Sequence, residues 1–209
     1  MKKRLLLLPL TALMLTGCKI TLFGKTIYLF EKNPGEQEEV KKDYFEFVPN
    51  MMKTPYFGDD PRTPQEFQYE GMTFTDRQAY YATNKDVLWF FNKWTGNPGC
   101  GATDDDKVTS ETVFAFLANK TAFEKGISKI EITTNAGTGK ARVHVKFGSS
   151  AFAESQQVTN YVQVQNGVSN TYTFTGDGTS KYFCISPRTD VGYYLTNLMV
   201  DSIKVYFAK

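Results

Sequence analysis

Apolar and polar side chains alternate most strictly between residues 140 and 147. The apolar set is Ala141, Val143, Val145 and Phe147. The polar set is Lys140, Arg142, His144 and Lys146. Because successive side chains of a strand point to opposite faces, this alternation predicts a β-strand with the apolar set in a core and the polar set in water.

Further short runs rich in β-branched and aromatic residues predict strands between turns. These runs are 72–74, 87–92, 113–117, 129–133, 161–165, 171–175, 182–185 and 202–207. The segments 135–137, 166–167 and 176–178 are predicted turns. Since no amphipathic helix is evident between the strands, the pattern favours a mainly β fold, an antiparallel β-sandwich like a jelly roll, over residues 65–209.

The amino terminus has a different pattern. Lys2, Lys3 and Arg4 precede an apolar run that ends at Leu15, which is too short for an ordinary membrane span. The tetrad 15–18 (LTGC) resembles a bacterial lipobox, which predicts a lipoprotein signal peptide over residues 1–17. The resemblance implies that Cys18 carries lipid, including acyl chains such as palmitate, and anchors an extracytoplasmic protein at the cell surface or the outer membrane.

Apolar and polar positions show no sustained period over residues 18–64, which are predicted to form a lipidated tether and packing arm. After the turn at residues 33–35 comes a charged stretch, in which the sequence permits a short helix that extends to Phe47. The run 20–30 carries too many apolar residues for a purely solvated linker. Two interpretations of that run stay open, an extra edge strand or a segment lying on the membrane surface.

The succession of strands in the last 100 residues or so resembles a known kind of module. The similarity rests on the segments 126–133, 141–148, 172–174, 182–185 and 198–206. They are similar to the jelly-roll modules of bacterial surface lipoproteins and of secreted hydrolases and nucleases. The resemblance implies ligand binding through loops or one sheet face. It implies no catalytic residue, because many sandwiches share this architecture without sharing an activity.

Charge and histidine content limit the partners and the chemistry. Removal of the signal peptide takes away three of the 24 basic residues, which leaves 21 against 22 acidic residues. Binding of nucleic acid depends on many basic side chains that neutralise phosphates, so no nucleic-acid partner is expected. The single histidine, His144, excludes mechanisms that need a histidine pair or a three-histidine metal site.

Two cysteines, Cys100 and Cys184, remain once Cys18 is assigned to the lipid. Disulfides persist outside the cytoplasm, so these two residues are candidates for a bridge. Such a bridge would join the Gly-rich loop 97–101 to a C-terminal strand. Because spacing in the sequence does not fix a distance in space, two unpaired thiols remain the alternative.

Aromatic residues are the best candidates for a contact surface, since the chain has 17 Phe, 12 Tyr and 2 Trp. Flat rings with a polar group stack well on sugars and are common at binding surfaces. The predicted ligand-binding residues are Trp94, Trp89, Tyr80, Tyr81, Tyr193 and Tyr194. In a strand, Trp89 points away from the face of Leu88 and Phe90, so one of these two faces is expected in the core. For Trp94 the alternative is a side chain that closes the edge of the core.

Two charged groups are candidate ligand sites. Asp104, Asp105 and Asp106 offer adjacent carboxylates for calcium, whereas the alternative is a solvated acidic turn that lacks the spacing of an EF-hand. No other cofactor is expected. The outward stripe of Arg142, His144 and Lys146 is suited to a phosphate or an acidic glycan, and its alternative is the wet face of a sheet.

No arrangement of nucleophile, base and orienting group stands out, so an enzyme is not expected. We predict a membrane-anchored, non-catalytic module that binds carbohydrate or another surface ligand. The alternative is a structural or adhesive protein that binds other proteins through a sheet edge or an apolar patch. A third hypothesis is a hydrolase that uses two carboxyl groups, whose spacing the sequence does not define.

Overall fold

The computed structural model describes the chain in several stretches. They are residues 19–22, 25–28, 43–51, 63–82, 85–91, 114–139, 141–188 and 197–209. The chain divides into two compact units after Lys42. In the first unit β1 (Lys19–Leu22) and β2 (Lys25–Tyr28) pair with each other as an antiparallel hairpin, so the apolar run 20–30 contains strands.

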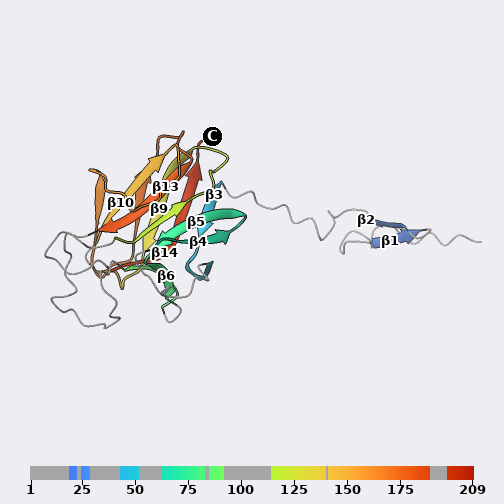
Figure 1. The fold of residues 1–209 in the computed structure, drawn as a ribbon. Coiled ribbons are helices and arrows are strands. Elements are labelled where there is room, and N and C mark those ends of the chain that lie inside the picture. The colour runs from blue at the N-terminus through green and yellow to red at the C-terminus, as the bar shows by residue number, and fades with distance from the viewer. Residues whose placement is uncertain are drawn as a thin grey trace, which may run out of the picture. The chain divides into compact units, whose positions relative to one another are not determined.

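The second unit is an antiparallel β-sandwich (Figure 1). One sheet, here called the β10 sheet, has the strand order β11-β10-β13-β8-β5-β4. The other, called the β14 sheet, has the order β12-β9-β14-β7-β6, and β3 also pairs with β14. The bounds are β3 (Tyr44–Phe47), β4 (Gln65–Tyr69), β5 (Met72–Arg77), β6 (Ala79–Ala82), β7 (Val87–Phe91), β8 (Phe116–Asn119), β9 (Ile127–Thr134), β10 (Ala141–Gly148), β11 (Tyr161–Val164), β12 (Asn170–Thr175), β13 (Tyr182–Arg188) and β14 (Asn197–Phe207).

The long strand β14 organises its sheet. Along one side it pairs with β9, and along the other it pairs first with β7 and then with β3. The helical option for the stretch that ends at Phe47 was wrong for residues 44–47, which form β3. Phe45 and Phe47 lie two residues apart, which is the spacing of one strand face, and the edge of β14 supplies backbone partners that a helix would not use.

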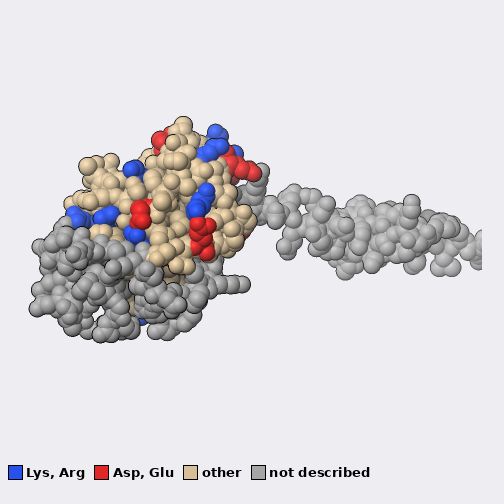
Figure 2. Space-filling model, viewed as in Figure 1, with Lys and Arg blue, Asp and Glu red and all other residues tan. Residues whose placement is uncertain are grey.

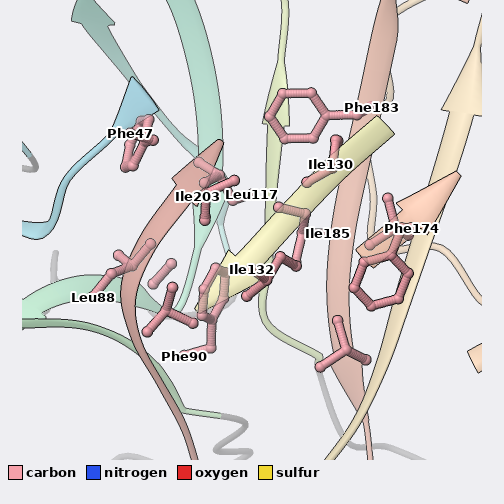
Figure 3. Close-up of a cluster of buried hydrophobic side chains, with 14 of the residues drawn as sticks. Phe47, Leu88, Phe90, Leu117, Ile130, Ile132, Phe174, Phe183, Ile185 and Ile203 are labelled. Atoms are coloured by element: carbon pink, nitrogen blue, oxygen red, sulfur yellow. The ribbon is translucent and has the colours of Figure 1, made fainter. Parts of the chain in front are cut away.

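The core lies between the two sheets. Figure 3 shows side chains of both sheets meeting there, among them Phe90 and Ile132 from the β14 sheet and Leu117 and Ile185 from the β10 sheet. Leu88 and Phe90 are fully buried, so this face of β7 is the core face. The predicted inward set of β10 is confirmed, because Ala141, Val143 and Val145 are buried and Phe147 packs against the same cluster.

The prediction that the other face of β10 lies in water was wrong at His144. This side chain is 1% exposed, whereas Lys146 on the same face is exposed. The reason is that the connection between β10 and β11 passes over this face, and both the N–H and the C=O of Val158 lie within hydrogen-bonding distance of His144 Nδ1. Lys140 lies outside the described residues.

A buried carboxyl group lies at the corner where the chain passes from β5 to β6. Asp76 is 3% exposed and accepts a hydrogen bond from the backbone N–H of Ala79, while its Oδ2 has no hydrogen-bond partner among the described residues. Burial raises the pKa of this carboxyl to about 7, against which the Ala79 N–H acts more weakly. The folded protein therefore holds this proton up to a higher pH than the unfolded chain does.

We expect the free energy of unfolding to fall by about 4 kcal/mol as the pH rises from about 4 to about 7, and not to fall further through this group above that range. The sign follows because the folded state binds more protons than the unfolded state in this window. Asp76→Asn should remove this part of the pH dependence. Urea unfolding of both proteins at pH 4.5 and pH 8 measures it, and an identical pH dependence in the variant would contradict the assignment.

Candidate functional site

Several predicted site residues lie outside the described part of the chain. They are Cys18, Trp94, Cys100, Asp104, Asp105, Asp106, Tyr193 and Tyr194. Lipidation of Cys18, calcium binding by the three aspartates and the roles of these aromatic residues stay predictions. Within the described stretches, no group of three or more His, Cys, Asp or Glu residues is placed to hold a metal ion.

The structure brings Trp89 and Tyr80 together on the outer face of the β14 sheet. The two residues are register partners on β7 and β6, and their rings lie 5.1 Å apart. They form a small apolar cluster with Val87 and Met199, in which Tyr80 is buried and Trp89 is partly buried. Tyr81 points the other way and packs against the main core. The cluster therefore packs as a secondary core more than it offers flat rings to a ligand.

Cys184 is a free, buried thiol. Its Sγ lies 3.4 Å from Ser186 Oγ and 3.6 Å from the carbonyl oxygen of Glu154, and burial raises the pKa of the thiol to about 11. A group that is buried and protonated at neutral pH reacts slowly. Because Cys100 lies outside the described residues, the predicted bridge between these two cysteines stays a prediction.

The outer face of the β10 sheet carries a group of polar and basic side chains. Arg142 on β10 lies directly opposite Arg188 on β13, and His144 lies opposite Ser186. The segment 149–160 covers the middle of this face, because the N–H of Gln156 donates to Ser186 Oγ at 2.8 Å. In Figure 2 basic side chains lie at several places on the visible face, some of them on the side where Figure 1 labels β10 and β13, with acidic side chains among them.

Arg77, on β5 of the same sheet, fastens the covering segment to the sheet. Its Nη1 lies 2.5 Å from a carboxylate oxygen of Glu154, and its Nε and Nη2 donate to the carbonyl oxygen of Phe114. The Arg77 side chain is 8% exposed, and its guanidinium lies 5.2 Å from the centre of the Phe116 ring. Arg77 thus binds two chain segments to the sheet, one at Glu154 and the other at Phe114.

Tyr161, Arg142 and Arg188 form what we call the arginine–tyrosine row. The guanidinium of Arg142 lies 4.8 Å from the centre of the Tyr161 ring, a cation–π contact. The guanidinium of Arg188 lies 4.2 Å from the Phe114 ring, and its Nη2 donates to Ser155 Oγ at 3.2 Å. Tyr161 is 46% exposed, so the row begins at an aromatic ring open to solvent.

The electrostatics of the row follow from burial and from its like charges. The pKa of Arg188 is lowered, first by partial burial and also by the charges of Arg77 and Arg142. The pKa of His144 is lowered by burial, and again Arg188 and Arg142 act in the same direction. His144 is therefore neutral at pH 7, and the arginines supply the positive charge. Such a surface is suited to hold an oxyanion or a sugar ring.

Comparison with models of known protein families and with curated protein sequences finds no match to this chain. In the described part of the chain, no helix is long and apolar enough to cross a membrane.

Tyr161 and Arg188 were not predicted as site residues from the sequence. A signal for Tyr161 is present, since Tyr161 and Gln163 alternate with Val162 and Val164, which pack inward. This alternation identifies Tyr161 as an outward-facing aromatic on a strand. Arg188 carries no comparable signal, because its place beside Arg142 depends on the pairing of β10 with β13.

Proposed function

We propose that this protein is a lipid-anchored, extracytoplasmic binding module without catalytic activity, and that it binds carbohydrate on the outer face of the β10 sheet. The observation that carries the proposal is the exposed ring of Tyr161 next to the guanidinium of Arg142. An exposed tyrosine offers a flat apolar face for a sugar ring and a hydroxyl for its polar groups. The lipobox-like tetrad that ends at Cys18 supports the anchor.

The position of the ring supports this function as well. Tyr161 begins β11, which is the edge strand of its sheet, so a ligand can approach it from the side and from the outer face. Its partner on β10 is His144, which is held under the segment 149–160, and the two rings lie 5.4 Å apart. A ring supported by a rigid sheet loses little conformational freedom on binding, which favours affinity.

A glycan-array screen of the full-length protein in a non-ionic detergent tests the binding. We expect specific binding that Tyr161→Ala weakens about tenfold or more, since the stacking surface is removed. Tyr44→Ala is the matched control, because Tyr44 is a partly buried tyrosine on β3 in the other sheet, and it should leave binding unchanged. Cys18→Ser should move the protein from the membrane fraction to the soluble fraction.

Two results would overturn the proposal. A folded protein that binds no glycan on the array would shift the function to a protein partner or a structural role. Glycan binding that is equally strong in Tyr161→Ala would place the ligand elsewhere on the molecule, and the outer face of the β10 sheet would lose its assignment.

A further inference from the structure

Two arginines face each other directly across neighbouring strands. Arg142 and Arg188 are register partners of β10 and β13, and both side chains lie on the outer face of the sheet. Like charges at directly opposed positions destabilise a sheet. A third arginine, Arg77, contributes positive charge at Arg188, and the carboxylate of Glu154 pairs with Arg77. The fold therefore concentrates positive charge on a face where charge repulsion works against folding.

Arg188 presents unused hydrogen-bonding capacity in this place. Its Nε is buried and has no hydrogen-bond partner among the described residues, while Nη2 donates to Ser155 Oγ. The Phe114 ring, 4.2 Å from the guanidinium carbon, holds the charged plane in position. A guanidinium carries five N–H donors in a rigid plane, and one that is fixed in position is well suited to hold a carboxylate or a sulfate.

The exposed tyrosine stands at one end of this pair. Tyr161 contacts Arg142 through its ring, so an aromatic surface and two guanidinium groups follow one another across β11, β10 and β13. This order suits a ligand in which an oxyanion is attached to a sugar ring. The ring would stack on Tyr161, and its acidic group would reach the arginines.

We propose that the arginine–tyrosine row binds an acidic polysaccharide, whose sugar rings carry carboxylate or sulfate groups. This inference rests on the proposed function, since it names the class of carbohydrate bound at the same face. The neighbouring side chains on this face are compatible with it. Lys146 donates to Gln156 Oε1, and His144 is held by Val158. Glu154, the acidic residue of the segment 149–160, is engaged by Arg77.

Binding of the full-length protein in a non-ionic detergent to polysaccharides of defined charge tests the inference. Polygalacturonate supplies carboxylates, dextran sulfate supplies sulfates, and dextran is the neutral probe. We expect binding to at least one acidic probe and none to dextran, with affinity falling as sodium chloride rises from about 50 to about 500 mM. The relative affinity for the first two probes identifies which oxyanion is preferred.

Charge-neutral variants locate the site. Arg142→Gln and Arg188→Gln should each weaken binding of the acidic probe about tenfold or more. Arg142→Lys, which keeps the charge but loses the fork of donors, should weaken it by a smaller factor. Lys181→Gln is the matched control, because it removes one positive charge from an exposed residue next to the far end of β13, and its affinity should equal that of the native protein.

Circular dichroism confirms that each variant is folded, and Arg142→Lys keeps the inference testable if a glutamine variant does not fold. Equal affinity for dextran and dextran sulfate, or unchanged binding in Arg142→Lys and Arg188→Gln, would overturn the inference while leaving carbohydrate binding at Tyr161 intact. Stronger binding to single-stranded DNA than to both acidic polysaccharides would also overturn it, since the phosphate backbone would then be the preferred oxyanion.

Discussion

Val143→Asp should unfold the sandwich. Val143 is 1% exposed and belongs to the main core between the two sheets. On either side it is paired with Val162 of β11 and Pro187 of β13, so a carboxylate there would have no access to water. An unpaired buried charge costs several kcal/mol, which is comparable to the whole free energy of unfolding of a domain.

Urea unfolding and thermal denaturation followed by circular dichroism measure this effect. We expect the variant to lack a cooperative transition at 25 °C or to lose about 4 kcal/mol or more. Lys146→Asp, on the opposite face of the same strand, is the control and should change stability by less than about 1 kcal/mol, because this side chain is exposed. A cooperative, native-like transition in Val143→Asp would mean that the register of β10 is inverted.

Gly126→Ala should cost about 3 kcal/mol or more, the second large effect. A Cβ atom at this position would lie 2.0 Å from the carbonyl oxygen of Gly178 and 2.8 Å from the Cα of Thr179. Both atoms belong to backbone that is fixed by hydrogen bonds, since the N–H of Gly178 donates to Ile127 O and the N–H of Ile127 donates to Ser180 O. The clash therefore involves backbone atoms, and no flexible side chain can move to relieve it.

The Gly126 effect is separated from backbone strain by a second glycine. Gly167 has a φ of +73° and nothing within 4 Å of a Cβ, so Gly167→Ala should cost only about 1 kcal/mol through its left-handed backbone. Differential scanning calorimetry of the two variants compares the stability lost through a steric clash at residue 126 with the stability lost through backbone strain at residue 167. Equal losses of stability would show that the close approach of residues 126 and 178 is not present in solution.

Much of the sandwich could be predicted from local alternation. The inward set of β10 is correct, because strand period alone fixes relative orientation. In β7 the period separated Leu88 and Phe90 from Trp89, but it left open which of the two faces lies in the core. The burial of His144 could not be predicted in this way. It depends on the covering segment 149–160, which has no period and is held by side-chain bonds such as that between Arg77 and Glu154.

The candidate site was less predictable than the fold. Trp89 and Tyr80 were grouped as ligand-binding candidates because both are aromatic, and the structure packs them in a largely buried cluster. The row of Tyr161, Arg142 and Arg188 combines residues that lie up to 46 positions apart, and their proximity depends on how three strands are paired. Strand register is set by the whole sheet, so a single segment of sequence does not reveal it.

The position of β14 has a consequence for the order in which this protein acquires its structure. β14 joins β9 to β7 and β3, yet it is the last strand along the chain. During any process that delivers the chain from its amino terminus, whether synthesis or export, β9 and β7 have no shared neighbour until residues 197–207 arrive. The β14 sheet therefore closes only after the other described strands of both sheets have been delivered.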